Sequence, residues 1–552
     1  MKLLIASSSA LALLVITPLA LLIGSTRVSA DPYAPVTVDP VAEDAPPIFS
    51  PGIRLVADLE QDYVEEEFFV SGAATVYTYS DPDDPKPDGI EPLGEDVPYT
   101  TRIIVRRPAD PHAFSGTVII EWWNSTAGFD TAPVWDPSAE FFAREGWIYV
   151  GVTNSNTSIG HLLAGCSIFP PIIPETCGDR YEGLSIPENG AAYEMVSQIA
   201  NLLKSSSSEN PIPSDYSVKR IFHAGQSQQG GSMITYASSF HFPINDGYFV
   251  QAASSARSIN SVFPACGSEG ADPYPGCTPR LEGDDRRVRT DLPVPVYRAL
   301  TETDVSGAIR SDARQEDTHD FRYYEVAGVT HMTVHVGVEL IPAGILGPDP
   351  LLLEDACMNP FNTLADGPVF GSHIYNAMWQ NMVWQSRWGV RPPHGELIET
   401  TVDENGDPII ARDAFDNAIG GIRPAGIAVP VATYLPNNEL ADSIPDPLRP
   451  LLGLACRLGG SVFPFDEETI DELYPTHRRY VKKVTAQTVR LQFHRFMLWE
   501  DAHAVREEAD ASGIGGDDPA CGRGHEVALI LPPLVFLGRR RRRARAGDAV
   551  PS

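Results

Sequence analysis

The amino-acid sequence predicts an α/β fold in which helices cover both faces of a mostly parallel sheet. In the first half of the chain, short apolar segments alternate with amphipathic segments, as expected for parallel strands that are joined by helices. Residues 191–204 carry apolar side chains at the spacing of a helix that lies on a sheet. No linker divides residues 53–509. We therefore expect one folded body of roughly 450 residues, a core with a large insertion or C-terminal elaboration.

The expected elements of the core follow one another in a regular order. Strands are predicted at residues 116–121, 147–152, 218–224, 294–300 and 322–327. Helices are predicted at residues 137–144 and 191–204, and in the second one Met195, Ile199 and Leu202 recur at helical spacing. The last two strands end in polar residues, so the sheet is expected to present chemically useful side chains at one edge.

The C-terminal part of the body, residues 340–509, is expected to pack over this core. Apolar side chains at helical spacing predict helices at residues 372–388 and 485–506. The methionine and tryptophan residues here are interpreted as core or lid residues rather than as a cofactor site. The acidic segment 412–417 lacks the ligand spacing and the glycine of a calcium loop. We therefore predict neither a cofactor nor a required metal.

The N-terminal residues indicate export. Lys2 precedes an apolar stretch at residues 3–23, and Val28-Ser29-Ala30 is a small-residue cleavage site, so residues 1–30 are predicted to be a signal peptide. An uncleaved membrane anchor is the alternative, because the stretch approaches the length of a membrane span; Pro18 and the cleavage-like end favour removal. Residues 31–52 are rich in proline and acidic residues and are expected to form an extended arm.

The C-terminal residues 510–552 form a linker and a tail of unusual composition. An apolar segment at residues 527–537 contains two prolines and precedes an arginine cluster at residues 539–543; it is short for a membrane-spanning helix. The tail resembles the tripartite sorting tags of some Gram-negative surface proteins, which a membrane enzyme reads and removes. A basic tail that touches phospholipid head groups or nucleic acid is the alternative. Together the two ends predict a periplasmic, cell-surface or extracellular protein.

Charge and cysteine content agree with an exported protein that binds no nucleic acid. The net charge is −32, and clustered cations occur only in the tail, whereas phosphate binding needs such clusters. The seven cysteines fit an oxidising compartment. Their spacing suggests the pairs Cys166 with Cys177, Cys266 with Cys277, and Cys357 with Cys456, which is one of many possible connectivities. The remaining Cys521 lies inside the tail, where it has a possible role in lipidation or processing.

Ser227 lies in a motif that is typical of a nucleophile. It is the centre of Gly225-Gln226-Ser227-Gln228-Gln229-Gly230-Gly231, between the predicted strand at residues 218–224 and an apolar helical pattern. A sharp turn between a strand and a helix exposes the serine hydroxyl. It also directs the first N–H groups of the helix at negative charge that develops beside it. The motif therefore predicts a nucleophilic serine.

A carboxylate and an imidazole follow later strands, as such a serine requires. Asp304 and His331 each lie four residues beyond a predicted strand. Histidine can take the serine proton near neutral pH and return it to a leaving group, and an acid holds the imidazole in the useful tautomer. Glu302 is the alternative acid on the same loop, although Asp304 lies at the more usual distance. His335 is a competitor for His331.

Donors for a developing oxyanion are expected from two places. One is the backbone N–H of Gln228, the residue after the nucleophile. The second donor is expected from the loop at residues 121–128, in which Asn124 either orients the loop or lends its own N–H. Trp122 or Trp123 is expected to form a wall of the acyl pocket; the alternative is that both are ordinary core aromatics.

These motifs together resemble a known family. The similar stretches are residues 119–124, 180–184, 225–229, 246–249, 301–304, 325–331, 420–424 and 474–477. They are similar to an uncharacterised α/β-hydrolase-domain family of bacterial secreted and cytosolic proteins, whose elbow looks like Gly-Glu-Ser-Gln-Ser; Gln226 and Gln229 depart from that pattern. The resemblance implies an α/β-hydrolase fold over residues 50–510, with Ser227, an acid at residues 302–304 and His331 as a catalytic triad. It implies no particular substrate.

The predicted function is hydrolysis of a small-molecule carboxylic ester through an acyl-serine intermediate. The same triad also cleaves amides, thioesters or lactones on this fold, or transfers acyl groups. A surface-binding protein with a decayed site is a further alternative, against which the presence of all three triad residues argues. The sequence makes no prediction about the oligomeric state.

Overall fold

The computed structural model of the protein describes most of the folded body. The described residues are 33–41, 53–81, 89–167, 177–253, 255–261, 287–310, 314–332, 338–362 and 371–516. The predicted signal peptide, most of the C-terminal linker and tail, and the residues His335, Cys266, Cys277 and Cys521 lie outside these ranges.

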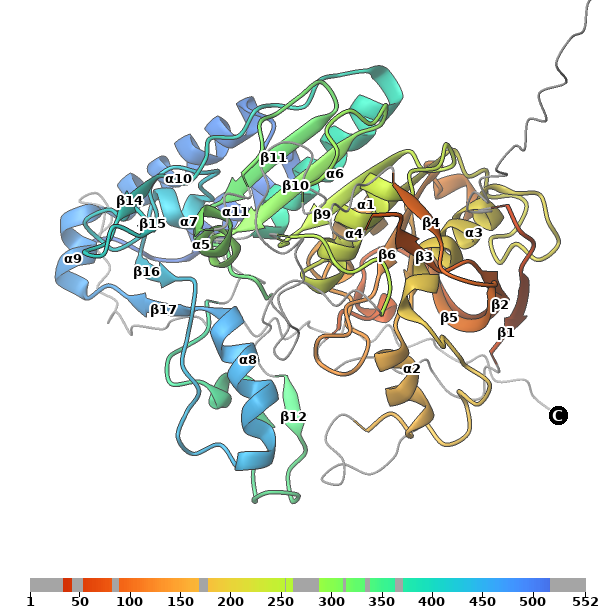
Figure 1. Ribbon diagram of the computed structural model, residues 1–552. Coiled ribbons are helices and arrows are strands. Elements are labelled where there is room, and N and C mark those ends of the chain that lie inside the picture. Colours follow the sequence, from red (N-terminus) through yellow and green to blue (C-terminus); the bar gives the residue numbers. More distant parts are fainter. Residues whose placement is uncertain are drawn as a thin grey trace, which may run out of the picture.

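The centre of the molecule is a nine-stranded sheet in the order β1-β2-β5-β7-β6-β8-β9-β10-β11 (Figure 1). The strands from β7 to β11 run parallel, whereas β1, β2 and β5 add an antiparallel edge. In sheet order the strands are β1 (Thr37–Pro40), β2 (Tyr63–Ala74), β5 (Val97–Pro108), β7 (Ile148–Val152), β6 (Thr117–Trp122), β8 (Arg220–Gln226), β9 (Gly247–Gln251), β10 (Val296–Thr301) and β11 (Phe321–Val326). The mostly parallel sheet predicted from the sequence is thus confirmed.

All five predicted strands are present, each with its ends within about two residues of the prediction. Four strands of the sheet were not predicted, and β1 lies within the expected extended arm. The long pair β2 and β5 carries buried charges: Glu67 accepts from Arg102 at 2.6 Å, and Arg106 donates to Glu65 at 2.7 Å. These ion pairs interrupt the apolar pattern along both strands, which is why the pattern does not reveal them.

Helices cover both faces of the sheet. Phe249 of β9 packs on Trp379 with a centroid distance of 4.6 Å, whereas the neighbouring Tyr248 packs on Tyr236 at 5.7 Å. Because successive residues of a strand point to opposite faces, these contacts place α6 on one face and α4 on the other. Helix α1 packs against α6, and α3 joins α4. The bounds are α1 (Trp135–Arg144), α3 (Ala192–Lys204), α4 (Gln228–Ser239) and α6 (Gly371–Trp388).

The remaining elements lie around this core. The other helices are α2 (Asn156–Leu163), α5 (Glu302–Arg310), α7 (Ala425–Ala428), α8 (Arg449–Gly459), α9 (Glu467–Leu473), α10 (His477–Phe493) and α11 (Trp499–Ala511). Two-stranded sheets are formed by β3 (Tyr77–Tyr79) with β4 (Ile90–Pro92), β12 (Glu339–Ile341) with β13 (Leu351–Leu352), β14 (Thr400–Val402) with β15 (Pro408–Ile410), and β16 (Ala432–Leu435) with β17 (Ser461–Pro464). No helix in the described ranges is both long and apolar enough to cross a membrane.

The prediction of one helix at residues 485–506 is wrong. The chain forms two helices there, α10 and α11, which pack against each other. Between them Arg495 adopts a positive φ of 59°, and Phe496 and Met497 turn into the core, where they are 6% and 4% exposed. A continuous helix has no turn in which to bury both side chains, so tertiary packing overrides the local pattern.

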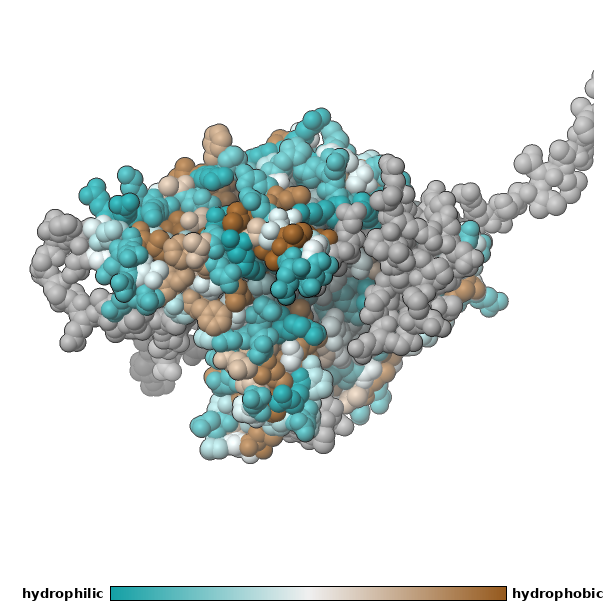
Figure 2. All heavy atoms as spheres, turned by 60° about the vertical axis from the view of Figure 1, so that its left-hand side comes forward, coloured by the Kyte–Doolittle hydropathy of each residue, from teal (hydrophilic) through white to brown (hydrophobic). Residues whose placement is uncertain are grey.

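Two of the three suggested disulfides lie among the described residues. Cys166 bonds to Cys177, and Cys357 bonds to Cys456. The second bond lies in a small separate core between α8 and the β12 region, at the lower edge of the molecule in Figure 1. On the face shown in Figure 2, hydrophilic side chains predominate and apolar ones are scattered among them, as is usual for a protein surface.

Candidate active site

Ser227 occupies the sharp turn between β8 and α4. Its backbone has φ 57° and ψ −117°, a conformation that costs a non-glycine residue about 1–3 kcal/mol and is found mainly at functional sites. The turn is fixed on both sides: the Ser227 N–H donates to Gln251 O, and its carbonyl accepts from Gly231 N, both at 3.0 Å. A Cβ atom on Gly225 would lie 2.3 Å from Gln229 O, so only glycine permits this close packing.

His331 and Asp304 form a close pair at the ends of neighbouring strands. His331 Nδ1 lies 2.6 Å from Asp304 Oδ1, and Asp304 Oδ2 accepts from the Thr301 N–H at 3.1 Å and the Thr301 hydroxyl at 2.5 Å. The strands β10 and β11 pair in parallel, so the residues that follow them meet at one edge of the sheet. The hydrogen bonds hold the imidazole in one orientation, with Nε2 directed away from the carboxylate.

The two groups shift each other's pKa. Burial by itself would lower the pKa of His331, but the charge and hydrogen bond of Asp304 outweigh burial and raise it above the ordinary value of 6.5. Burial by itself would raise the pKa of Asp304, but His331 and the Thr301 hydrogen bonds outweigh it and lower the pKa below 3.8. The acid is therefore ionised near neutral pH, and the imidazole is a stronger base than a free histidine.

Glu302 does not contact His331. Its carboxylate accepts from the Gly328 N–H at 2.7 Å and from Arg412 Nη2 at 2.8 Å, and the residue is 1% exposed. Burial raises the pKa of Glu302, against the opposing effect of Arg412. Of the two candidate acids, Asp304 is therefore the one that the fold directs at the histidine.

Gln226 connects the serine turn to the histidine. Its Nε2 donates to the His331 carbonyl at 2.7 Å, and its own carbonyl accepts from Asn124 Nδ2 at 3.0 Å. The residue before Ser227 is thereby bound both to His331 and to the loop that follows β6. Gln226 departs from the family's elbow pattern, and that departure was the available signal, although its structural role was not predicted.

Neither the Ser227 hydroxyl nor His331 Nε2 makes a hydrogen bond to another described residue, and such bonds often tighten only when substrate binds.

The predicted oxyanion loop is placed beside the serine turn, but two of its amides are already used. The Trp123 N–H donates to Val152 O at 3.1 Å, and the Asn124 N–H donates to Thr131 O at 3.0 Å. The expectation that Asn124 lends its own N–H is therefore wrong, whereas its side chain does orient the loop through Gln226. The next residue, Ser125, donates from both N–H and hydroxyl to Gln228 Oε1, at 3.1 and 2.9 Å.

Trp123 is a core residue rather than a wall of a pocket. It is 2% exposed, and its indole N–H donates to the Tyr149 hydroxyl at 2.7 Å. A Cβ atom on Gly151 would lie 2.2 Å from the indole ring, so the strand β7 packs directly on it. The alternative of an ordinary core aromatic applies to Trp123, and the acyl pocket has to be sought elsewhere.

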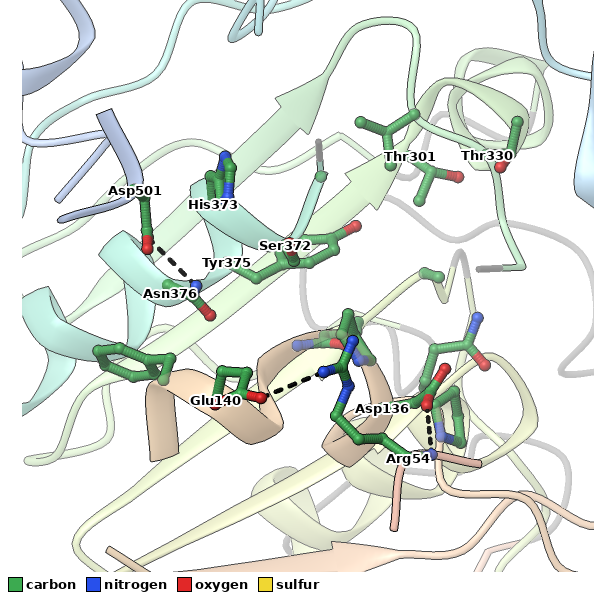
Figure 3. A pocket seen from close by; sticks show the side chains of 18 of the residues that line it. Arg54, Asp136, Glu140, Thr301, Thr330, Ser372, His373, Tyr375, Asn376 and Asp501 are labelled. Atoms are coloured by element: carbon green, nitrogen blue, oxygen red, sulfur yellow. Dashed lines mark hydrogen bonds and ion pairs between the residues drawn. The ribbon is translucent and has the colours of Figure 1, made fainter. Parts of the chain in front are cut away.

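A cavity of about 160 Å³ lies beside His331, and we call it the His331 cavity. It is lined by residues at the ends of β8, β10 and β11 and by side chains of α1, α6 and α11 (Figure 3). Its charged groups are paired: Arg54 with Glu140 at 3.2 Å, and Arg144 with Asp501 at 3.3 Å. The side-chain amide of Asn376 also donates to the Asp501 carboxylate, at 3.2 Å.

Comparison with known proteins identifies the fold. The family model described as the α/β-hydrolase domain matches residues 35–507, and the chain belongs to this family. The fold is therefore the α/β-hydrolase fold, as predicted. A search of curated proteins finds no similar sequence.

Solved structures of esterases are distantly similar to the chain. A lipase/esterase from Lactobacillus plantarum is 12% identical and matches over 41% of this chain and 86% of that one, with a TM-score of 0.26. An esterase from Pyrococcus furiosus is 12% identical over 50% of this chain and 87% of that one, with a TM-score of 0.25. An esterase from Rhizomucor miehei is 10% identical over 49% of this chain and 76% of that one, with a TM-score of 0.24. At these scores the likeness adds nothing to the family assignment.

Proposed function

We propose that the protein is a serine hydrolase that cleaves carboxylic esters through an acyl-serine intermediate. Ser227 attacks the ester carbonyl, His331 takes the serine proton and then gives it to the leaving alcohol, and Asp304 orients and stabilises the imidazolium. The observation that carries the proposal is the 2.6 Å contact between His331 Nδ1 and Asp304, next to a serine in a strained turn. Family membership supports the same chemistry.

Stabilisation of the oxyanion is assigned to Gln228 and Ser125. The Gln228 N–H is the first of α4, where N–H groups have no partner within the helix and the helix dipole favours negative charge. Within the loop at residues 121–128, from which the second donor is expected, Ser125 replaces Asn124, because among the described residues its N–H and hydroxyl meet only the side chain of Gln228. Rotation of that side chain frees both Ser125 donors for substrate.

Export is part of the proposal. The disulfides Cys166–Cys177 and Cys357–Cys456 fit an oxidising compartment, and they agree with the signal-peptide prediction for residues 1–30. The C-terminal tail is proposed to engage a membrane or a sorting enzyme. The substrate is a small-molecule ester.

The decisive experiment is labelling of the mature protein with a fluorophosphonate, followed by peptide mapping, beside a series of p-nitrophenyl esters of increasing acyl length. We expect a label on Ser227 and turnover of at least the short esters, and loss of both in S227A with an unchanged melting temperature. A folded S227A variant that still turns over esters would refute the nucleophile. A folded wild-type protein without label would favour the binding-protein alternative, and label without ester turnover would favour another acyl bond.

A further inference from the structure

A second cavity, of about 140 Å³, lies at the start of α4. It is lined by Gln228 and Gln229, the two residues that follow Ser227, and by residues from the ends of β6 and β7 and from α3. The His331 cavity, in contrast, contacts Gln226, the residue before Ser227. The chain neighbours of the nucleophile thus line one cavity on each side, whereas Ser227 itself is not among the lining residues of either. We call the second one the Arg257 cavity, after the one cation among its described lining residues.

Arg257 is half-buried and unpaired. Among the described residues its guanidinium has neither an ion-pair partner nor a hydrogen-bond partner, although other partly buried arginines, such as Arg314 and Arg412, bind carboxylates. Burial lowers the pKa of Arg257, but an arginine keeps its charge at any physiological pH. A cation in such a position is costly unless an anion accompanies it.

The position of Arg257 relative to Ser227 is fixed by the backbone. The Arg257 N–H donates to Gly231 O at 3.1 Å, and the Gly231 N–H donates to Ser227 O at 3.0 Å. A Cβ atom on Gly231 would lie 2.6 Å from Arg257 Cγ, so the arginine side chain crosses α4 where glycine leaves room. Gly231 is four residues from Ser227, which corresponds to about 6 Å along the helix axis.

Two further polar groups of this cavity lack partners. Gln229 is 4% exposed, and its amide makes no hydrogen bond to another described residue. Trp122 is 1% exposed, and its indole N–H is buried without a partner in the described part of the chain. Buried polar groups are nearly always hydrogen-bonded, so the unpaired Gln229 amide beside the unpaired Arg257 fits a ligand in this cavity. Arg257 can only donate hydrogen bonds.

The described lining of the cavity carries no opposing charge. None of its described lining residues is aspartate or glutamate, in a chain with a net charge of −32. The His331 cavity, which holds the paired ions, includes Asp136, Glu140 and Asp501. A negatively charged group is therefore attracted to the Arg257 cavity, where Arg257 can donate to it.

We propose that the Arg257 cavity binds a carboxylate at the far end of the acyl chain, so that the preferred substrates are monoesters of dicarboxylic acids. The planar guanidinium of Arg257 forms two parallel hydrogen bonds to such a carboxylate, and the side-chain NH2 of Gln229 supplies a further donor. Because the Arg257 backbone binds Gly231, four residues after Ser227, the proposal is for short acyl chains, of the length of succinate, glutarate or adipate. This inference rests on the proposed function, because Ser227 has to hold the scissile carbonyl.

The test compares charged and neutral esters of matched length. We would measure kcat/KM for p-nitrophenyl hemiesters of succinate, glutarate and adipate, each beside the neutral p-nitrophenyl ester of the same chain length. For the wild-type protein we expect at least one hemiester to be preferred. In R257Q that preference should fall by about 10- to 100-fold, the usual contribution of hydrogen bonds to a charged group, while turnover of neutral esters persists. R257K should keep part of the preference, because it retains the charge without the planar fork.

The control variant is R289Q, which removes the same charge from an exposed ion pair with Asp291 and should leave the preference unchanged. A wild-type protein that turns over the neutral esters as well as the hemiesters, or better, overturns the inference whether or not R257Q folds. A preference that persists in folded R257Q also overturns it. Failure of the proposed function looks different, because then neither class of ester is turned over and Ser227 is not labelled by a fluorophosphonate.

Discussion

Glu302 and Asp304 lie two residues apart in the first turn of α5 and are both largely buried, yet they have different partners. Asp304 faces the loop after β11 and binds His331 at 2.6 Å. Glu302 faces the other way, towards the Gly328 N–H and Arg412. The pKa of Asp304 is lowered, and burial raises that of Glu302. One turn of a helix thus presents one acid to the proposed catalytic base and another to a structural cation. The direction in which each carboxylate points, rather than its burial or the residue type, separates the roles of the two acids.

The largest expected effect is on activity when the acid beside His331 is neutralised. Asp304→Asn keeps the shape of the side chain but removes the charge that stabilises the imidazolium and fixes its tautomer. We expect kcat/KM for a p-nitrophenyl ester to fall by about 10⁴-fold, with circular dichroism and melting temperature close to those of the wild type. A folded D304N variant with nearly full activity would show that Asp304 is not the triad acid.

Glu302→Gln should show the opposite pattern, a loss of stability with little change in kcat/KM. The substitution removes the closer carboxylate of Arg412, at 2.8 Å, and leaves only the exposed Asp416 carboxylate at 3.9 Å. Since breaking a buried ion pair costs 3–5 kcal/mol and Arg412 is 22% exposed, we expect a loss of about 3 kcal/mol in the free energy of unfolding. Urea denaturation measures it. If E302Q instead lost activity as severely as D304N while remaining stable, the two assignments would have to be exchanged.

Thr301→Val tests how far the environment of Asp304 matters. Valine has the shape of threonine but lacks the hydroxyl that donates to Asp304 Oδ2, while the backbone N–H of residue 301 remains. We expect kcat/KM to fall by about tenfold, equivalent to ~1.4 kcal/mol, and T301S to restore most of it. Equal activity of T301V and wild type would mean that the hydroxyl contributes nothing to the orientation of Asp304.

The same contrast shows what the sequence could and could not predict. Strands such as β6 and β8 are buried on both faces, so their continuous apolar runs predict them directly. The strands β2 and β5 were missed because they bury ion pairs such as Glu67 with Arg102. Spacing beyond the strand ends predicted Ser227, Asp304 and His331 as candidates, because parallel strands bring their carboxyl ends together.

Choices between neighbouring groups depend on contacts that the chain order does not encode. Spacing favoured Asp304 over Glu302, but their different partners are set by the positions of His331 and Arg412, which lie far along the chain from both acids. The Asn124 N–H was lost as an oxyanion donor because it binds Thr131 across a local bridge. Nothing in the sequence marks Arg257, since an unpaired cation is recognisable only when its surroundings are known.

The smallest expected effect concerns pH, and it also separates the two acids. The proposed mechanism needs neutral His331, so kcat/KM should fall as the pH drops through the histidine pKa, which Asp304 raises above 6.5. In D304N the imidazolium loses that stabilisation, so the acid limb of the residual activity should move to lower pH. In E302Q it should stay where it is in the wild type, because Glu302 does not contact the histidine. A pH profile of kcat/KM for the three proteins measures this. A limb that moved in E302Q and stayed in D304N would mean that the acid two residues away, and not the one in contact, controls the base.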